Sequence, residues 1–113
     1  ILFMSWPYKN TPKMQVALEK AFFDAATTNR IRLIPAGPAF FYVNQNFPEI
    51  NLYTNDNRHP SPAGTYLATL MVFTTLTDKS PIGNSYTMGL DKDAAKTLQE
   101  VAWFIHQNFQ QKN

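Results

Sequence analysis

The chain has 113 residues, 44% of them hydrophobic and 16% charged, which suits one folded domain and excludes a disordered tail. The net charge is +2, and the ten basic residues are scattered, so the sequence lacks the positive cluster that nucleic acid or an anionic membrane requires. With no cysteine, disulfides and thiol chemistry are excluded. No apolar stretch approaches the ~20 residues of a membrane span. We predict a single domain over residues 1–113, with no nucleic-acid partner and no membrane span.

The N-terminal part of the chain predicts a strand, a crossover helix and a second strand. The continuous apolar run Ile1–Trp6 is typical of a strand covered on both faces. Thr11 and Pro12 then resemble an N-cap and first helical position, opening a helix that ends near residues 27–29. Its apolar stripe consists of Met14, Ala17, Leu18, Ala21, Phe22 and Ala25. Ile31–Ile34 is a second apolar strand, so the order predicts parallel pairing.

The middle of the chain is less regular. Pro35–Pro38 predicts a rigid turn at the carboxyl edge of the sheet, and residues 39–46 favour a short helix. Residues 47–57 are polar and irregular in pattern. They contain a small apolar anchor made of Ile50, Leu52 and Tyr53.

Two further helices are predicted in the last third of the sequence. Ser61 and Pro62 form a cap and a proline start for a helix that runs to about Thr77. Its apolar side contains Leu67, Leu70, Met71 and Thr74. After a loop over residues 78–89, Asp91 caps a final helix. The stripe of that helix contains Ala94, Leu98, Val101, Ala102, Ile105 and Phe109.

Two strands make a small sheet for three or four helices. A two-stranded pair is marginal alone and normally belongs to a larger sheet. Because the chain also opens on Ile1 directly into an apolar strand, we interpret it as a fragment of a longer domain. One sheet edge should then be exposed, and we expect another copy of the chain, in a homo-oligomer, or a missing segment to cover it.

One loop carries residues with chemical potential. Asp56 lies three residues before His59, in a loop that enters a helix, so its carboxylate can reach the imidazole Nδ1–H. That contact fixes the tautomer and leaves Nε2 free as a base. Pro60 restricts the loop, and Gly64 permits close approach of another backbone. The arrangement is typical of two members of a serine-hydrolase triad.

The motif D-x-x-H-P-S-x-x-G-x-Y-L, from Asp56 to Leu67, resembles the last block of the SGNH (GDSL-type) hydrolases, which include esterases acting on acylated carbohydrates. The order of elements over residues 1–83 is also similar to that family. The resemblance implies a flavodoxin-like three-layer α/β fold, present here as a C-terminal fragment. It implies that Asp56 and His59 are catalytic, that the substrate is a small-molecule or carbohydrate ester, and that no cofactor is needed.

The chain departs from that family in lacking a recognisable nucleophile. The Gly-Asp-Ser-Leu block, the oxyanion-hole Gly block and the Gly-x-Asn block have no match. The four serines are Ser5, Ser61, Ser80 and Ser85, and none has the Gly-Asp context. We therefore expect the chain alone to be inactive. With the missing blocks supplied, a serine would attack an ester carbonyl while His59 takes its proton and Asp56 steadies the imidazolium.

Other interpretations of these residues are open at this point. Asp56 and His59 can form an ordinary Asx turn on a surface loop, or a metal pair that needs further ligands such as His106. We expect His106 instead to face solvent near a helix C-terminus. For the whole chain, the alternative is a non-catalytic module that oligomerises and binds a ligand or protein partner.

The aromatic residues have two interpretations each. Trp6 and Tyr8 follow the first strand, where they can line a substrate cleft, but we favour packing under the D-x-x-H loop. Phe40–Tyr42 can form a platform for a lipid or a sugar, but we favour contact with the core or with a partner. Trp103 and Phe104 widen the apolar face of the last helix, which is expected to dock on a missing part of the fold or on a second chain.

Overall fold

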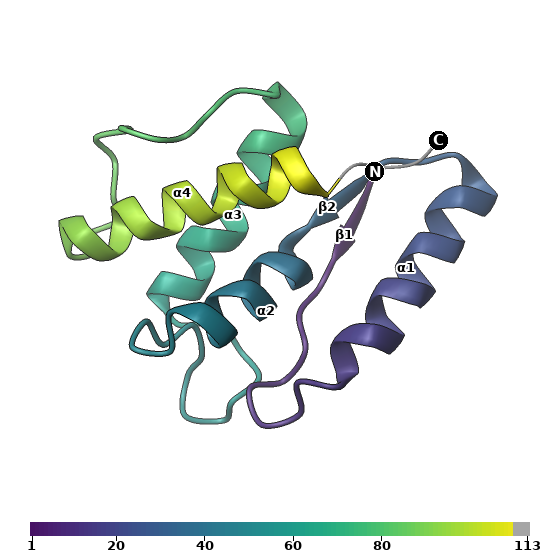
Figure 1. Ribbon diagram of the computed structural model, residues 1–113, viewed down its shortest axis with the longest axis horizontal. Helices are drawn as coiled ribbons and strands as arrows, with labels where there is room; N and C mark the ends of the chain where they lie inside the picture. The colour runs from purple at the N-terminus through teal and green to yellow at the C-terminus, as the bar shows by residue number, and fades with distance from the viewer. Residues whose placement is uncertain (110–113) are drawn as a thin grey trace.

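The computed structural model describes residues 1–109, in which two short parallel strands are combined with four helices (Figure 1). In chain order the elements are β1 (Leu2–Met4), α1 (Met14–Asn29), β2 (Leu33–Pro35), α2 (Ala36–Asn46), α3 (Pro62–Thr77) and α4 (Lys92–Asn108). Leu2 of β1 lies opposite Leu33 of β2. The predicted strand–helix–strand unit with parallel pairing is confirmed.

Helices pack on both faces of the sheet. On one face, Met4 and Leu33 pack with Ala26 of α1. On the other face, Ile34 joins the larger core that α2, α3 and α4 build. Figure 1 shows α1 on one side of the strands and α3 with α4 on the other. The small α/β fold follows from strands whose alternate side chains enter two different cores. No helix within residues 1–109 is long and apolar enough to cross a membrane.

The outer edge of the sheet is exposed, as the sequence predicts. Within the described residues β1 pairs with β2 alone. Phe3 lies opposite the buried Ile34, yet Phe3 is 38% exposed and the neighbouring Ile1 is 57% exposed. The prediction that both faces of the first strand are covered is therefore wrong at Phe3. The strand is also shorter than predicted, since the chain leaves the sheet after Met4.

The first helix departs from its predicted start and buried face. A turn that includes Thr11 and Pro12 precedes the helix, so Thr11 is not its cap. Gln15 is buried, whereas Ala17 and Ala21 of the predicted stripe are exposed. The buried side of α1 differs from the predicted stripe because the first turn of α1 packs on the start of α2, where Gln15 lies beside Gly37.

The predicted turn over Pro35–Pro38 is replaced by helix. α2 begins directly at Ala36, so the helix predicted for residues 39–46 is confirmed and is longer. Pro38 lies in the first turn, where its missing N–H breaks no helical bond. Gly37 permits the junction, because a Cβ there would lie 2.2 Å from the carbonyl oxygen of Ser5.

Helices α3 and α4 begin where the sequence predicts. The Ser61 hydroxyl accepts a hydrogen bond from the N–H of Gly64, and the Asp91 carboxylate accepts from those of Asp93 and Ala94. The buried predicted residues of the two helices are Leu67, Leu70, Met71, Thr74, Leu98, Val101, Ala102 and Ile105. These two helices contribute much of the larger core, and the anchor residues Leu52 and Tyr53 are buried in the same core.

Candidate active site

Asp56 and His59 lie in a tight hairpin-like loop between α2 and α3. The loop closes through an antiparallel bridge between Tyr53 and Pro60, and the N–H of Thr54 donates to the carbonyl of His59 at 2.8 Å. Asn57 occupies the turn with φ of +60°, a conformation that asparagine tolerates better than most residues. The sequence therefore brings the ends of the loop together within residues 53–60.

The carboxylate of Asp56 organises the loop with both of its oxygens. Oδ2 is hydrogen-bonded to Nδ1 of His59. Oδ1 accepts hydrogen bonds from the backbone N–H groups of Arg58 and His59 and from the hydroxyl of Thr54, each at 2.9 Å. The contact predicted from the three-residue spacing is thus present, and it coexists with the Asx-type turn that was its alternative.

The hydrogen bonding assigns the tautomer of His59. Because Nδ1 faces a carboxylate, Nδ1 carries a proton, and in the neutral ring Nε2 is then a free base. The side chain of His59 is 78% exposed, and Nε2 makes no hydrogen bond within residues 1–109. The ring is therefore oriented at one nitrogen and accessible at the other.

These hydrogen bonds also lower the pKa of the Asp56 carboxyl group below its usual range. The largest contribution is the backbone N–H of His59, followed by the His59 ring, the N–H of Arg58 and the Thr54 hydroxyl. All of these donors favour the charged form of the carboxyl group.

We expect this lowered pKa to produce a loss of stability in acid. A carboxyl group whose pKa is lower in the folded than in the unfolded state stabilises the fold above its unfolded pKa, about 4, and loses that contribution as the pH falls. Thermal unfolding should therefore show that the difference between wild type and Asp56→Asn shrinks from about pH 5 to about pH 2. A difference that does not change over this range contradicts the lowered pKa.

Residues that follow β1 hold the loop in place. The indole N–H of Trp6 donates to the carbonyl of Arg58, and the N–H of Lys9 donates to the carbonyl of Asn57, both at 2.9 Å. The guanidinium of Arg58 lies 4.8 Å from the centre of the Tyr8 ring. Trp6 and Tyr8 thus pack against the loop, which is the interpretation that the sequence favours over a substrate cleft. These contacts place His59 at the carboxyl end of the strands. In Figure 1 the segment that follows β1 and the loop between α2 and α3 run side by side there.

The start of α3 supports the loop from the other side. A Cβ on Gly64 would lie 2.2 Å from the carbonyl oxygen of Leu52, so only glycine permits this approach, as predicted. The Ser61 hydroxyl, besides capping α3, donates to the carbonyl of Asn51 at 2.8 Å. The P-S-x-x-G portion of the motif therefore holds the loop against the helix.

Tyr53 anchors the loop in the core. Its hydroxyl donates to the carbonyl of Pro7 at 2.7 Å and accepts from the side-chain amide of Asn44 at 3.0 Å. Burial raises the pKa of this hydroxyl, which therefore stays protonated. Its ring lies edge-on to Phe40, which is stacked on Trp6.

Removing that hydroxyl should destabilise the protein. In Tyr53→Phe the buried carbonyl of Pro7 loses its hydrogen-bond donor. We therefore expect the free energy of unfolding, measured in urea, to fall by about 1–3 kcal/mol. Tyr8→Phe is a suitable control, since Tyr8 is at the surface and its hydroxyl makes no hydrogen bond within residues 1–109. Equal stabilities of the two variants would contradict the anchoring role.

The structure brings no serine to His59. Ser61 is committed to its cap, and Ser80 accepts from the N–H of Ile82. Within residues 1–109, neither Ser5 nor Ser85 is hydrogen-bonded to His59. The described part of the chain thus holds a hydrogen-bonded aspartate–histidine pair with no serine bonded to the histidine.

His106 does not join this site. It lies in the last turn of α4 as predicted, but its predicted exposure to solvent is wrong. Its side chain is 17% exposed, bonds through Nε2 to Asp78 at 2.7 Å and stacks on Trp103. Asp78 lies 28 residues earlier, so this contact gives no local sequence signal. No cluster of three or more histidine, aspartate or glutamate residues that could hold a metal lies within residues 1–109.

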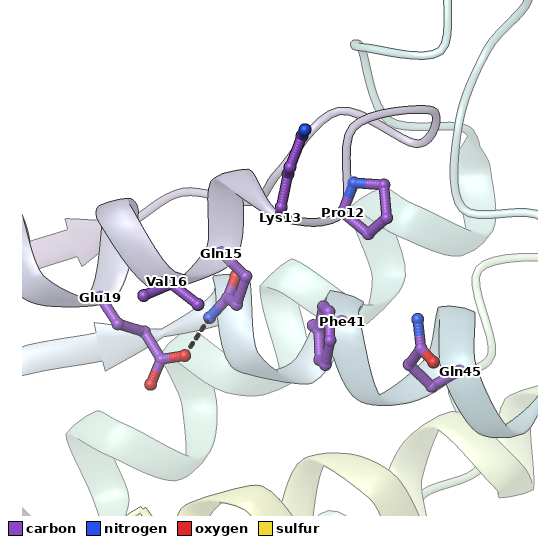
Figure 2. Close-up of a pocket in the computed structure, with 7 residues that line it drawn as sticks. All are labelled: Pro12, Lys13, Gln15, Val16, Glu19, Phe41 and Gln45. Carbon is purple, nitrogen blue, oxygen red and sulfur yellow. Dashed lines mark hydrogen bonds between the residues drawn. The ribbon is translucent and has the colours of Figure 1, made fainter.

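A separate hollow of about 350 Å³ lies between α1 and α2 (Figure 2). The buried Gln15 lines it and donates from Nε2 to Glu19 at 2.7 Å, while Phe41 and Gln45 enter from α2. Lys13 balances the charge of Glu19, so the lining does not favour a ligand of one sign. Phe41 thus lines a hollow, whereas the adjacent Phe40 lies in the core as predicted.

Comparison with protein-family models, curated proteins and solved structures finds no match to this chain.

Proposed function

We propose that Asp56 and His59 are the acid and the base of the catalytic triad of a serine esterase of the SGNH type. The observation that carries the proposal is the hydrogen bond that Nδ1–H of His59 donates to the Asp56 carboxylate, in a loop fixed at the carboxyl end of two parallel strands. Ligand sites in α/β folds form at that end of the sheet. The D-x-x-H-P-S-x-x-G-x-Y-L motif supports the family, because its Ser61 and Gly64 perform definite structural tasks.

The nucleophile is a serine outside these 113 residues. In the first step Nε2 of His59 removes the serine proton as the serine oxygen attacks the ester carbonyl. The alcohol leaves with that proton, and an acyl-enzyme remains. Water then attacks, again giving a proton to His59, and the free acid and serine are regenerated. Asp56 stabilises the imidazolium in both steps, and no cofactor takes part.

The exposure of His59 agrees with a triad whose serine comes from a segment outside these 113 residues. A ring that is 78% exposed leaves space for a segment carrying the serine to approach Nε2. The substrate we propose is a small-molecule or carbohydrate ester, on the strength of the motif. The flavodoxin-like arrangement of the complete domain is part of the same proposal.

The second candidate is a non-catalytic module that associates through the edge of β1. The exposed edge and the exposed side chains of Ile1 and Phe3 favour it. In that case the loop would hold His59 for structural reasons, and its removal would leave function unchanged.

Ester hydrolysis by the protein expressed from its complete reading frame separates these candidates. We expect His59→Ala to reduce hydrolysis of p-nitrophenyl acetate to the rate in buffer. His106→Ala is the matched control, because it removes the other histidine, and it should retain kcat at temperatures where the variant is folded. Equal activity of the two variants would contradict the proposed function.

A further inference from the structure

The segment between α3 and α4 forms a second hollow, remote in sequence from the His59 loop. Its volume is about 510 Å³, and it lies between residues 82–87 and the first turns of α4. Figure 1 shows this segment arching past the N-terminal half of α4. The volume is in the range of pockets that hold small organic ligands, about 300–1,000 Å³.

Buried hydrogen bonds fix the wall of this hollow. Gln99, which lines it, is 3% exposed, and its Oε1 accepts from the N–H of Gly83 at 3.1 Å. Its Nε2 donates to the hydroxyl of Tyr66 at 2.9 Å and to the carbonyl of Asn84 at 3.0 Å. The Tyr66 hydroxyl in turn donates to the carbonyl of Tyr86 at 2.8 Å. The buried side chains of Gln99 and Tyr66 therefore fix the loop that forms one wall of the hollow.

The lining is positively charged. Lys92 and Lys96 lie one helical turn apart, on the same side of α4, and no aspartate or glutamate lines the hollow. Neither lysine forms an ion pair within the described part of the chain. Ser85 and Thr87 add hydroxyl donors from the opposite wall.

The acidic residues of α4 are engaged elsewhere or lie outside the lining. The Asp91 carboxylate accepts hydrogen bonds from the N–H groups of Asp93 and Ala94 at the N-terminus of the helix. Asp93 and Glu100 are exposed and are not among the residues that line the hollow. Charge complementarity therefore selects an anion.

We propose that this hollow is a binding site for a small organic dianion, with one carboxylate or phosphate group between Lys92 and Lys96. The hydroxyls of Ser85 and Thr87 bind the polar remainder of the ligand, and Ile82 contacts its apolar part. The site does not depend on the esterase proposal, because none of its residues belongs to the His59 loop.

Titrations of the chain with succinate and with neutral succinamide, followed by NMR chemical shifts, test the proposal. We expect saturable shifts of the amides of residues 82–87 and 92–99 with succinate alone, weakening as salt is added. The double variant Lys92→Gln/Lys96→Gln should weaken binding by about tenfold or more, since both ligand-facing charges are removed. Lys79→Gln, an exposed change in the same segment outside the lining, should bind like wild type.

Three outcomes would overturn the proposal: equal binding of succinamide and succinate, unchanged binding in the double variant, or no saturable binding of either succinate or inorganic phosphate. The phosphate titration, run in parallel, shows which of the two anionic groups the site prefers. Wild type, the double variant and Lys79→Gln are compared by thermal unfolding, so that a lost site is distinguished from a lost fold. His59→Ala should bind succinate like wild type, which keeps this result separate from the esterase assay.

Discussion

Replacing Gly64 by alanine is expected to destabilise the protein by about 3 kcal/mol and to displace the loop that carries Asp56 and His59. Intrinsic propensity alone predicts the opposite sign, because alanine is favoured over glycine in a helix by about 1 kcal/mol. Packing decides the outcome. The added Cβ would lie 2.2 Å from the carbonyl oxygen of Leu52 and 3.1 Å from Cβ of Pro60, so backbone must move.

Urea unfolding measures this cost, and Gly83→Ala is its control. A Cβ at Gly83 meets no atom within 4 Å, but the residue has φ of +88°. Backbone strain alone should therefore cost that variant about 1 kcal/mol. If Gly64→Ala is as stable as wild type, the contact between α3 and the loop is not as described. The NMR signals of the His59 ring in Gly64→Ala report independently whether the loop has moved.

Replacing Asp56 by asparagine is expected to reverse the tautomer of His59. The side-chain Oδ1 of asparagine can still accept from the N–H groups of Arg58 and His59. Its amide NH₂ then takes the place of Oδ2 and donates to Nδ1, which must lose its proton. The proton moves to Nε2, so the ring can no longer act as a base there. In the active esterase this change should lower kcat by as much as about 10⁴-fold.

The tautomer can be measured in this chain without a substrate. With ¹⁵N-labelled histidine above the pH at which the ring is protonated, wild type should show Nδ1 protonated and Nε2 bare, and Asp56→Asn the reverse. Asp78→Asn is the matched control, because it alters the other aspartate–histidine pair and should leave the His59 signals unchanged. The same tautomer in wild type and Asp56→Asn would contradict the orienting role of Asp56.

The sequence predicts best what local chemistry decides. Ser61 and Asp91 cap helices through bonds to residues two or three positions ahead, so both starts are correct. The contact between Asp56 and His59 spans three residues and closes within one turn, so its spacing is sufficient to predict it. The role of Gly64 can be predicted because it lies in the first turn of a helix, where no β-turn requires a glycine. A glycine at such a position indicates a close approach of another backbone segment.

Features that depend on distant segments escape the sequence. The buried face of α1 is set by its packing on α2, which brings the polar Gln15 inside and leaves Ala17 outside. The bond between Asp78 and His106 joins residues 28 positions apart. The hollow beside the first turns of α4 depends on Gln99, which holds Gly83 and Asn84 from the preceding loop. None of these pairings has a spacing that a helix or a turn imposes.

Fluorophosphonate labelling of the protein expressed from its complete reading frame, followed by intact mass and peptide mapping, tests the central claim most directly. The account predicts one adduct, on a serine outside the 113 residues, and its loss in His59→Ala. An adduct on Ser5, Ser61, Ser80 or Ser85 would show that this chain completes its own triad. An adduct that persists in His59→Ala, or no adduct at all, would contradict the assignment of Asp56 and His59 as the acid and base of a serine esterase.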